Sequence, residues 1–256
     1  MNADYLIAYG VGSLFTFAVG FGVWRFGRGK TLTESGMVAM GVSSSNSGYI
    51  GYPILLQFLG PVAGVGLALT VLIENLLTIP LALAIVESGE TAHLSWQHTV
   101  LQSLKRMTKV PMMQAIVLGF VFSMLGVQLP EVLSKTVNMF AASTAAIALF
   151  VNGGSLVGMR VVGLIQQVRW IAIGKLVLHP LAVGVMLMLV GPVVPSLKIS
   201  AVLLAGMPML GIYPLLAQRY GQEGFCAAAL LVTTVASFFT ISLILWAMGE
   251  LPGWHV

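Results

Sequence analysis

Long apolar runs, separated by short polar segments, form the dominant pattern of the chain. A run of about 20 apolar residues is needed to cross the hydrocarbon core of a bilayer. The backbone in lipid must satisfy its own hydrogen bonds, so such runs are expected to be helices. The pattern predicts an all-α polytopic membrane protein with about eight transmembrane helices, at residues 5–25, 35–58, 61–86, 110–127, 133–158, 168–190, 198–219 and 223–249.

Composition supports this interpretation. Hydrophobic residues make up 58% of the 256 residues and charged residues only 8%, whereas a soluble domain carries about a quarter charged residues. The N-terminus lacks a basic region followed by a cleavage site, so no removed signal peptide is expected. The single cysteine, Cys226, excludes an internal disulfide and a Cys-rich metal site.

Basic residues fall mainly on one side of the membrane if the helices alternate in direction. The loops of that side hold nine Lys and Arg residues: Arg25, Arg28, Lys30, Lys105, Arg106, Lys109, Arg160, Arg169 and Arg219. The opposite loops hold only Lys135 and Lys198. The positive-inside rule then predicts a multi-pass protein of the inner or plasma membrane with both termini periplasmic or extracellular.

Two segments, Tyr52–Gly60 and Tyr213–Gly221, share Tyr, Pro, Leu, Gln and Gly in the same register. Under the alternating topology they run in opposite directions, as in transporters built from inverted repeats with broken helices. Proline removes a backbone donor and clashes with the preceding turn, so the helices are expected to break around residues 43–53 and 206–214. A short match in apolar sequence can also arise by chance.

Polar residues gather at these breaks. Free amides at the start of a half-helix bind carboxylates, so we expect a substrate site there. The alternative is a kinked, Ser-capped helix that serves packing alone. The residues predicted to bind substrate are Ser45, Asn46, Ser47, Tyr49, Pro53, Asn75, Asn152, Pro208, Tyr213 and Pro214.

Three ionisable residues within the apolar runs are candidates for proton coupling. Glu74 falls near the middle of the third run, where an ionisable group is costly unless it is paired or functional. Lys175 and His179 lie one turn apart on one helix face. Lys175 could instead snorkel to the membrane surface, and His179 could satisfy the carbonyl freed by Pro180. No acidic cluster indicates a sodium or other metal site, and no cofactor is expected.

The long polar loop at residues 91–109 alternates apolar and polar residues with helical spacing. Such a segment is typical of an amphipathic helix in the membrane interface. It divides the chain into residues 1–90, with three spans and the break at 43–53, and residues 110–256, with five spans and the break at 206–214.

Several of these stretches carry a resemblance to a known family. They are Asn46 through Gly60, with Pro53 seven positions after Asn46, Met207 through Ala217 followed by Tyr220-Gly221, and more weakly Glu74-Asn75, Ala148 to Gly158 and Lys175 to Pro180. In them the chain resembles the auxin efflux carrier family, which includes plant PIN auxin exporters and bacterial malonate and malate permeases. The resemblance runs over essentially the whole chain.

The resemblance implies two inverted repeats of five helices, in a fold similar to bile acid sodium symporters and sodium/proton antiporters. The broken helices would cross at the substrate site, and a transport domain would move against a scaffold like an elevator. Asn46 and Pro53 would belong to the first crossing helix, and Pro208 and Pro214 to the second. The chain departs from this pattern because it starts at what would be the third helix. A truncated product, a misassigned start and a true eight-helix variant are open alternatives.

The function expected is secondary transport of small organic anions such as malonate, malate or auxin-like acids. The expected partners are the anion, the lipid bilayer and a second copy in a homodimer, without nucleic acid. No G-x-x-x-x-G-K-[ST] sequence is present, so ATP is not expected to drive transport. The alternatives are a truncated, non-transporting membrane subunit or sensor and an intramembrane enzyme. The four histidines lack the spacing of a metalloprotease motif, which disfavours the enzyme.

Overall fold

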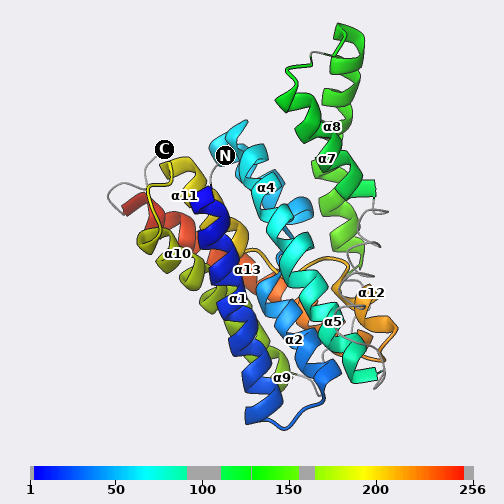
Figure 1. The fold of residues 1–256 in the computed structure, drawn as a ribbon. Helices are drawn as coiled ribbons and strands as arrows, with labels where there is room; N and C mark the ends of the chain where they lie inside the picture. Colours follow the sequence, from blue (N-terminus) through cyan, green and yellow to red (C-terminus); the bar gives the residue numbers. More distant parts are fainter. Residues whose placement is uncertain (1–2, 91–110, 128, 156–164, 251–256) are drawn as a thin grey trace.

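The computed structural model describes residues 3–90, 111–127, 129–155 and 165–250, which form a bundle of helices (Figure 1). The protein is an all-α polytopic membrane protein, as the apolar runs predicted. Segments named η are π-helical. The elements are α1 (Ala3–Gly22), η1 (Val23–Gly27), α2 (Leu32–Ser43), η2 (Ser47–Gly51), α3 (Tyr52–Leu59), α4 (Val62–Ile73), η3 (Glu74–Thr78), α5 (Ile79–Glu90), α7 (Pro111–Met124), α8 (Glu131–Ser155), α9 (Ile165–Ile173), η4 (Gly174–Leu178), α10 (His179–Leu189), α11 (Pro195–Ala205), α12 (Tyr213–Gln218) and α13 (Glu223–Glu250).

Long helices alternate with broken ones in the same order near both ends of the chain. Within the described residues, four continuous helices are long and apolar enough to span a membrane: Ala3–Gly27, Val62–Gly89, Ile165–Leu189 and Glu223–Ala247. Between the first two, the chain is interrupted between α2 and η2, and between the last two it is interrupted between α11 and α12. The two predicted helix breaks are therefore confirmed. α7 and α8 correspond to the predicted fourth and fifth runs and lean away from the other helices (Figure 1).

Prolines account for most of the π-helical turns. The segments η2, η3 and η4 each end two residues before a proline, at Pro53, Pro80 and Pro180. Proline cannot donate to the preceding turn and crowds the carbonyl four residues back. A locally widened turn relieves that crowding and leaves the helix continuous, and such turns are frequent at functional sites. Glu74 and Lys175 are the first and second residues of two of these segments.

The two broken helices cross where their backbones are extended. Ser45 and Met209 form an isolated antiparallel β-bridge, and the Asn46 N–H donates to the Pro208 carbonyl at 2.8 Å. These bonds satisfy backbone groups that a broken helix would otherwise leave unpaired in an apolar environment. The breaks that the sequence separates by about 160 residues are thus joined directly.

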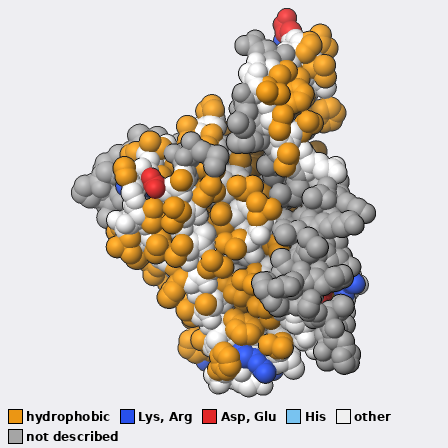
Figure 2. Space-filling view, viewed as in Figure 1, with side chains coloured by type: hydrophobic (Ala, Val, Ile, Leu, Met, Phe, Trp, Pro, Cys, Tyr) orange, Lys and Arg blue, Asp and Glu red, His pale blue; other side chains and the backbone are white. Residues whose placement is uncertain are grey.

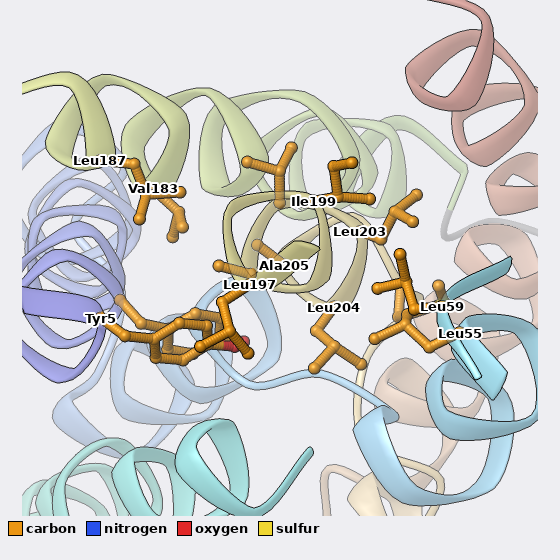
Figure 3. Packing of buried hydrophobic residues seen from close by; sticks show 14 of the residues in the cluster. Tyr5, Leu55, Leu59, Val183, Leu187, Leu197, Ile199, Leu203, Leu204 and Ala205 are labelled. Carbon is orange, nitrogen blue, oxygen red and sulfur yellow. The ribbon is translucent and has the colours of Figure 1, made fainter. Parts of the chain in front are cut away.

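One of two buried apolar clusters lies around α11, which is enclosed by neighbours from both ends of the chain. Figure 3 shows leucine side chains of α11 between two neighbouring helices. α10 contributes Val183 and Leu187 to this packing, and α3 contributes Leu55 and Leu59. α1 packs against both α2 and α10. A Cβ on Gly12 of α1 would lie 2.9 Å from backbone atoms of Val183, so only glycine permits this approach. Small residues commonly allow such close helix contacts in membranes.

On the described part of the face in Figure 2, apolar side chains outnumber charged ones, and Lys and Arg side chains are visible at the end of the molecule where α1 ends. This distribution suits a bilayer with a basic rim. The predicted amphipathic linker at residues 91–109 lies outside the described residues. The division at this linker stays a prediction.

Candidate substrate site

A cluster of polar side chains is buried where the broken helices cross. Glu74, Lys175 and His179 are 2%, 0% and 0% exposed, and the neighbouring Ser45 and Ser47 are 1% and 2% exposed. These five residues come from three separate regions of the sequence. Buried charges in a membrane protein are expensive and commonly mark a substrate or ion pathway.

Glu74 contacts the first break. Its Oε1 accepts a hydrogen bond from the backbone N–H of Ser45 at 2.8 Å, and both carboxylate oxygens lie 3.0 Å from the Ser47 hydroxyl. The Tyr9 hydroxyl of α1 donates to Oε1 at 3.2 Å. Donors of this kind replace the water that an ionised carboxylate loses on burial. The carboxylate thus occupies the position at the start of η2 where the sequence predicted a substrate carboxylate.

Lys175 contacts the second break and the first. Its Nζ lies 2.7 Å from the Ser45 hydroxyl, 2.7 Å from the Ala205 carbonyl and 2.8 Å from His179 Nδ1. An ammonium group has three donors, and these are three acceptors in reach. Ala205 is the last residue of α11, so the ammonium also meets the negative end of that helix. The alternative that Lys175 snorkels to the membrane surface is therefore wrong.

His179 extends the cluster to α1. Its Nε2 lies 2.9 Å from the hydroxyl of Ser13, and its Nδ1 faces Lys175. If the ammonium of Lys175 donates to Nδ1, a neutral imidazole carries its proton on Nε2 and donates to Ser13. The histidine therefore bonds with polar side chains of the cluster, whereas the sequence also allowed a role at the carbonyl freed by Pro180.

Ser45 connects the two charged residues. Its N–H donates a hydrogen bond to Glu74, and its hydroxyl oxygen accepts one from Lys175. In the part of the chain that the structure describes, Glu74 and Lys175 form no direct ion pair within 4.0 Å. The carboxylate and the ammonium together give a net charge of zero, which limits the cost of burying either one. Ser45, a residue of the crossing, therefore bridges the carboxyl group of Glu74 and the amine of Lys175.

Tyr9 and Ser13 belong to the polar cluster but were not among the residues predicted from the sequence. Both are fully buried on α1, and with Tyr5 they recur at every fourth residue. Residues with this spacing lie on one face of a helix. A stripe of hydroxyl groups along an otherwise apolar first span was therefore the signal that could have found them. Tyr5 itself bonds with Thr70 at 2.7 Å and with the Gly66 carbonyl at 3.3 Å, one turn away from the cluster.

Several predicted binding residues have other contacts. Tyr213 donates its hydroxyl hydrogen bond to the Met37 carbonyl at 2.8 Å, which ties α12 to α2. Asn75 donates to the Val71 carbonyl of its own helix at 2.9 Å, and Tyr49 is 45% exposed. The side chain of Asn152 lies outside the described residues. A role of these four residues in substrate binding therefore stays a prediction.

The remaining predicted residues lie at the breaks. Asn46 is 1% exposed and its N–H donates a hydrogen bond to the Pro208 carbonyl, so both residues belong to the crossing. Pro53 and Pro214 stand in the first turns of α3 and α12, where a missing N–H is tolerated. Pro214 lies at the start of the second half of its broken helix, whereas Pro53 follows η2, with which the second half of the first broken helix begins.

The chemistry of the cluster suits the handling of an anion or a proton. Lys175 supplies a cation, Glu74 a group that can take up a proton, and Ser45, Ser47 and Tyr9 supply hydroxyl groups. Among the described ranges, no group of three His, Cys, Asp or Glu side chains is arranged to hold a metal ion. The arrangement is therefore best described as a carboxyl group and an amine that Ser45 bridges, with further polar neighbours.

Comparison with known proteins gives consistent matches. A family described as "Membrane transport protein" matches residues 5–245. A protein of Rhizobium meliloti named "Putative malonate transporter" is 29% identical over 98% of this chain and 79% of its own length. The "Uncharacterized transporter YfdV" of Escherichia coli K12 is 27% identical over 67% of this chain and 53% of its own length.

Proposed function

Because the chain belongs to the membrane transport protein family, which is that of the auxin efflux carriers, we propose that it is a secondary transporter of small carboxylates. The observation that carries this proposal is the buried ammonium of Lys175 at the crossing of the broken helices. Among the described residues it is the only fully buried Lys or Arg. The name of the Rhizobium meliloti relative points to the same substrate class, with malonate as the substrate to test first.

A substrate carboxylate would bind between Lys175 and Ser45. The Nζ of Lys175 and the N–H of Ser45 are both donors, and a charge-assisted hydrogen bond to each would orient the anion. The Ser47 hydroxyl supplies a further donor from the same break. Elimination of water from such a site strengthens these electrostatic contacts.

The resident carboxylate of Glu74 would compete with the substrate for those donors. It already accepts from Ser45 and Ser47, so a substrate carboxylate must replace it. Protonation of Glu74 would release it, and the incoming anion would then restore the net charge to zero. Uptake of one carboxylate charge with one proton is the coupling that this exchange supports.

The groups that face Glu74 favour such a proton exchange. Tyr9 of α1 and the serines of the first break donate to its carboxylate, and Lys175 lies across Ser45 with His179 beyond it. An acidic outer solution would therefore drive anion uptake. A substrate with one ionised carboxylate, the ammonium of Lys175 and the protonated Glu74 would together carry no net charge across the membrane, which avoids the cost of moving net charge.

Alternating access would require the crossing to move as one body. The Ser45–Met209 bridge and the Asn46–Pro208 hydrogen bond join the two breaks, which supports an elevator-like displacement of both broken helices together. Lys and Arg residues at one end support an inner or plasma membrane location with that end in the cytoplasm and both termini outside. A homodimer would supply the fixed scaffold.

The test is uptake of radiolabelled malonate into proteoliposomes with a controlled pH gradient. Malate and indole acetate serve as competing anions, and malonamide serves as the uncharged control. The proposal expects saturable malonate uptake that an acidic exterior accelerates and that malonamide does not inhibit. Absence of saturable uptake by folded protein would contradict it.

A further inference from the structure

An apolar groove with a basic rim lies apart from the polar cluster. The groove encloses about 330 Å³ between α1 with η1, α2, and the helix formed by α9, η4 and α10. Its lining is apolar over most of its length, from Leu181 and Val177 to Trp24 and Trp170. Val177 and Leu181 are 45% and 60% exposed, so the groove opens toward the surroundings of the bundle.

Two arginines lie over the aromatic end of the groove. The guanidinium carbon of Arg28 is 4.2 Å from the ring centre of Trp24 and 5.9 Å from that of Trp170. The guanidinium of Arg169 lies 5.3 Å from the Trp170 ring. Contacts of this length place both cations beside the two tryptophans that line this end of the groove, although neither arginine is itself part of the lining.

Neither arginine is matched by a nearby carboxylate. Within the described ranges the ion pairs are Lys30–Glu34 and Lys135–Glu131, and both arginine side chains are exposed. The groove therefore ends in two positive charges whose guanidinium donors are accessible to an external anion. Arginine forms paired hydrogen bonds with phosphate oxygens particularly well.

The dimensions fit one leaflet of a bilayer. Trp170 and Leu181 are eleven residues apart on one helix, which corresponds to roughly 16 Å at the α-helical rise. One leaflet contributes about 15 Å of hydrocarbon. Tryptophans are typical of the boundary between hydrocarbon and headgroups, so the arginines lie at headgroup level when the groove lies along the acyl chains.

We propose that this groove binds one anionic glycerophospholipid, with an acyl chain along Val177 and Leu181 and the headgroup phosphate at Arg28 and Arg169. The two exposed guanidinium groups favour a headgroup of net negative charge over a zwitterionic one, in which a second cation offsets the phosphate. The apolar lining accepts a hydrocarbon chain and offers little to a polar solute. The bound lipid would brace α1 against α9, η4 and α10, the helices that carry Ser13, Lys175 and His179.

The proposal is tested by native mass spectrometry of the full chain in detergent, with phosphatidylglycerol and phosphatidylcholine of identical acyl chains at equal concentration. Wild type is expected to retain one phosphatidylglycerol in preference to phosphatidylcholine. Each arginine near an anionic headgroup is worth about fivefold in affinity, so R28Q and R169Q together should remove the preference. R219Q, an equal charge change at an exposed arginine that makes no cation–π contact with the tryptophans of the groove, should retain it.

A second pair of variants tests the acyl chain. V177W fills the groove from an exposed position and should lose retained lipid of both headgroup types. Val185 lies on the same helix, is 53% exposed and is outside the groove lining, so V185W should behave as wild type. Equal retention of both lipids by wild type, or undiminished retention by V177W, would overturn the proposal. Conversion of a dimer to a monomer by V177W with unchanged lipid retention would instead assign the groove to contact between two copies.

Discussion

The backbone N–H of Asn46 donates to the carbonyl of Pro208 at 2.8 Å. Asn46 follows the end of α2 and Pro208 follows the end of α11, so this single bond joins the two broken helices at their interruption. Ser45, one residue away, contacts both Glu74 and Lys175. A displacement of the crossing would therefore change the surroundings of both charged side chains at once.

Replacement of Glu74 by glutamine should uncouple transport from protons. Glutamine keeps the size of the side chain but cannot gain and lose a proton in the transport cycle. We expect exchange of internal and external malonate to continue, while acceleration of net uptake by an acidic exterior disappears. Counterflow and pH-driven uptake measured on the same proteoliposomes separate the two effects. Unchanged pH-driven uptake would rule out Glu74 as the proton carrier.

Removal of the Tyr9 hydroxyl should tighten malonate binding. Tyr9 donates to the carboxylate that competes with the substrate, and a hydrogen bond to a charged group is worth about 1.5–3 kcal/mol. Tyr9→Phe should therefore lower the malonate KM by about tenfold. Tyr5→Phe, the same change on the same helix at a hydroxyl that bonds with Thr70, should leave KM unchanged. A KM that rises in Tyr9→Phe would contradict the competition between the two carboxylates.

Substitution of Gly12 should destabilise the packing of α1 on α10. The added Cβ of Gly12→Ala would lie 2.9 Å from backbone atoms of Val183, which cannot rotate away as a side chain can. Overpacking of this kind costs about 1–3 kcal/mol. Gly22→Ala on the same helix meets no atom within 4 Å and is the control. Thermal unfolding in detergent should show a lower midpoint for Gly12→Ala alone.

The start of α2 should contribute a small pH-dependent stabilisation. Partial burial would raise the pKa of Glu34, but the hydrogen bonds from Lys30 and from the Thr31 backbone outweigh this effect and lower the pKa below 4.5. A lowered folded-state pKa means that the stabilisation is present above the unfolded pKa and is lost as the pH falls through the folded pKa. Glu34→Gln should therefore lower the unfolding midpoint at neutral pH, and the difference from wild type should vanish in strong acid. A difference that persists in acid would exclude this carboxylate as its source.

The sequence predicted the features that depend on pattern alone. The apolar runs predicted the long helices, and Pro208 and Pro214 predicted the second interruption, because proline acts through local backbone sterics. The first interruption lies at residues 44–46, before the π-helical segment that precedes Pro53. The depth of Glu74 in its run marked it as a candidate, and the structure places it in the polar cluster.

The contacts between distant residues could not be predicted in the same way. The approach of Lys175 to Ser45 spans 130 residues of sequence, and it depends on how α10 packs against α1 and α11. The same limitation explains Tyr213, whose position beside a break predicted a binding residue, although its hydroxyl reaches Met37. A polar side chain near a break can face either the crossing or a neighbouring helix, and only tertiary packing decides which.

The most direct test of the account is malonate uptake by variants of Lys175. The buried ammonium is the proposed anchor of the substrate carboxylate, so Lys175→Met should reduce uptake by at least about tenfold, the loss expected for one charge-assisted hydrogen bond. Lys135→Met removes a lysine whose side chain is 73% exposed on α8 and should retain uptake. The double variant with Glu74→Gln and Lys175→Met has no unpaired buried charge at the crossing and separates a loss of binding from a loss of folding. The account predicts that this double variant folds but does not transport malonate; a double variant that transports malonate at the wild-type rate would contradict it.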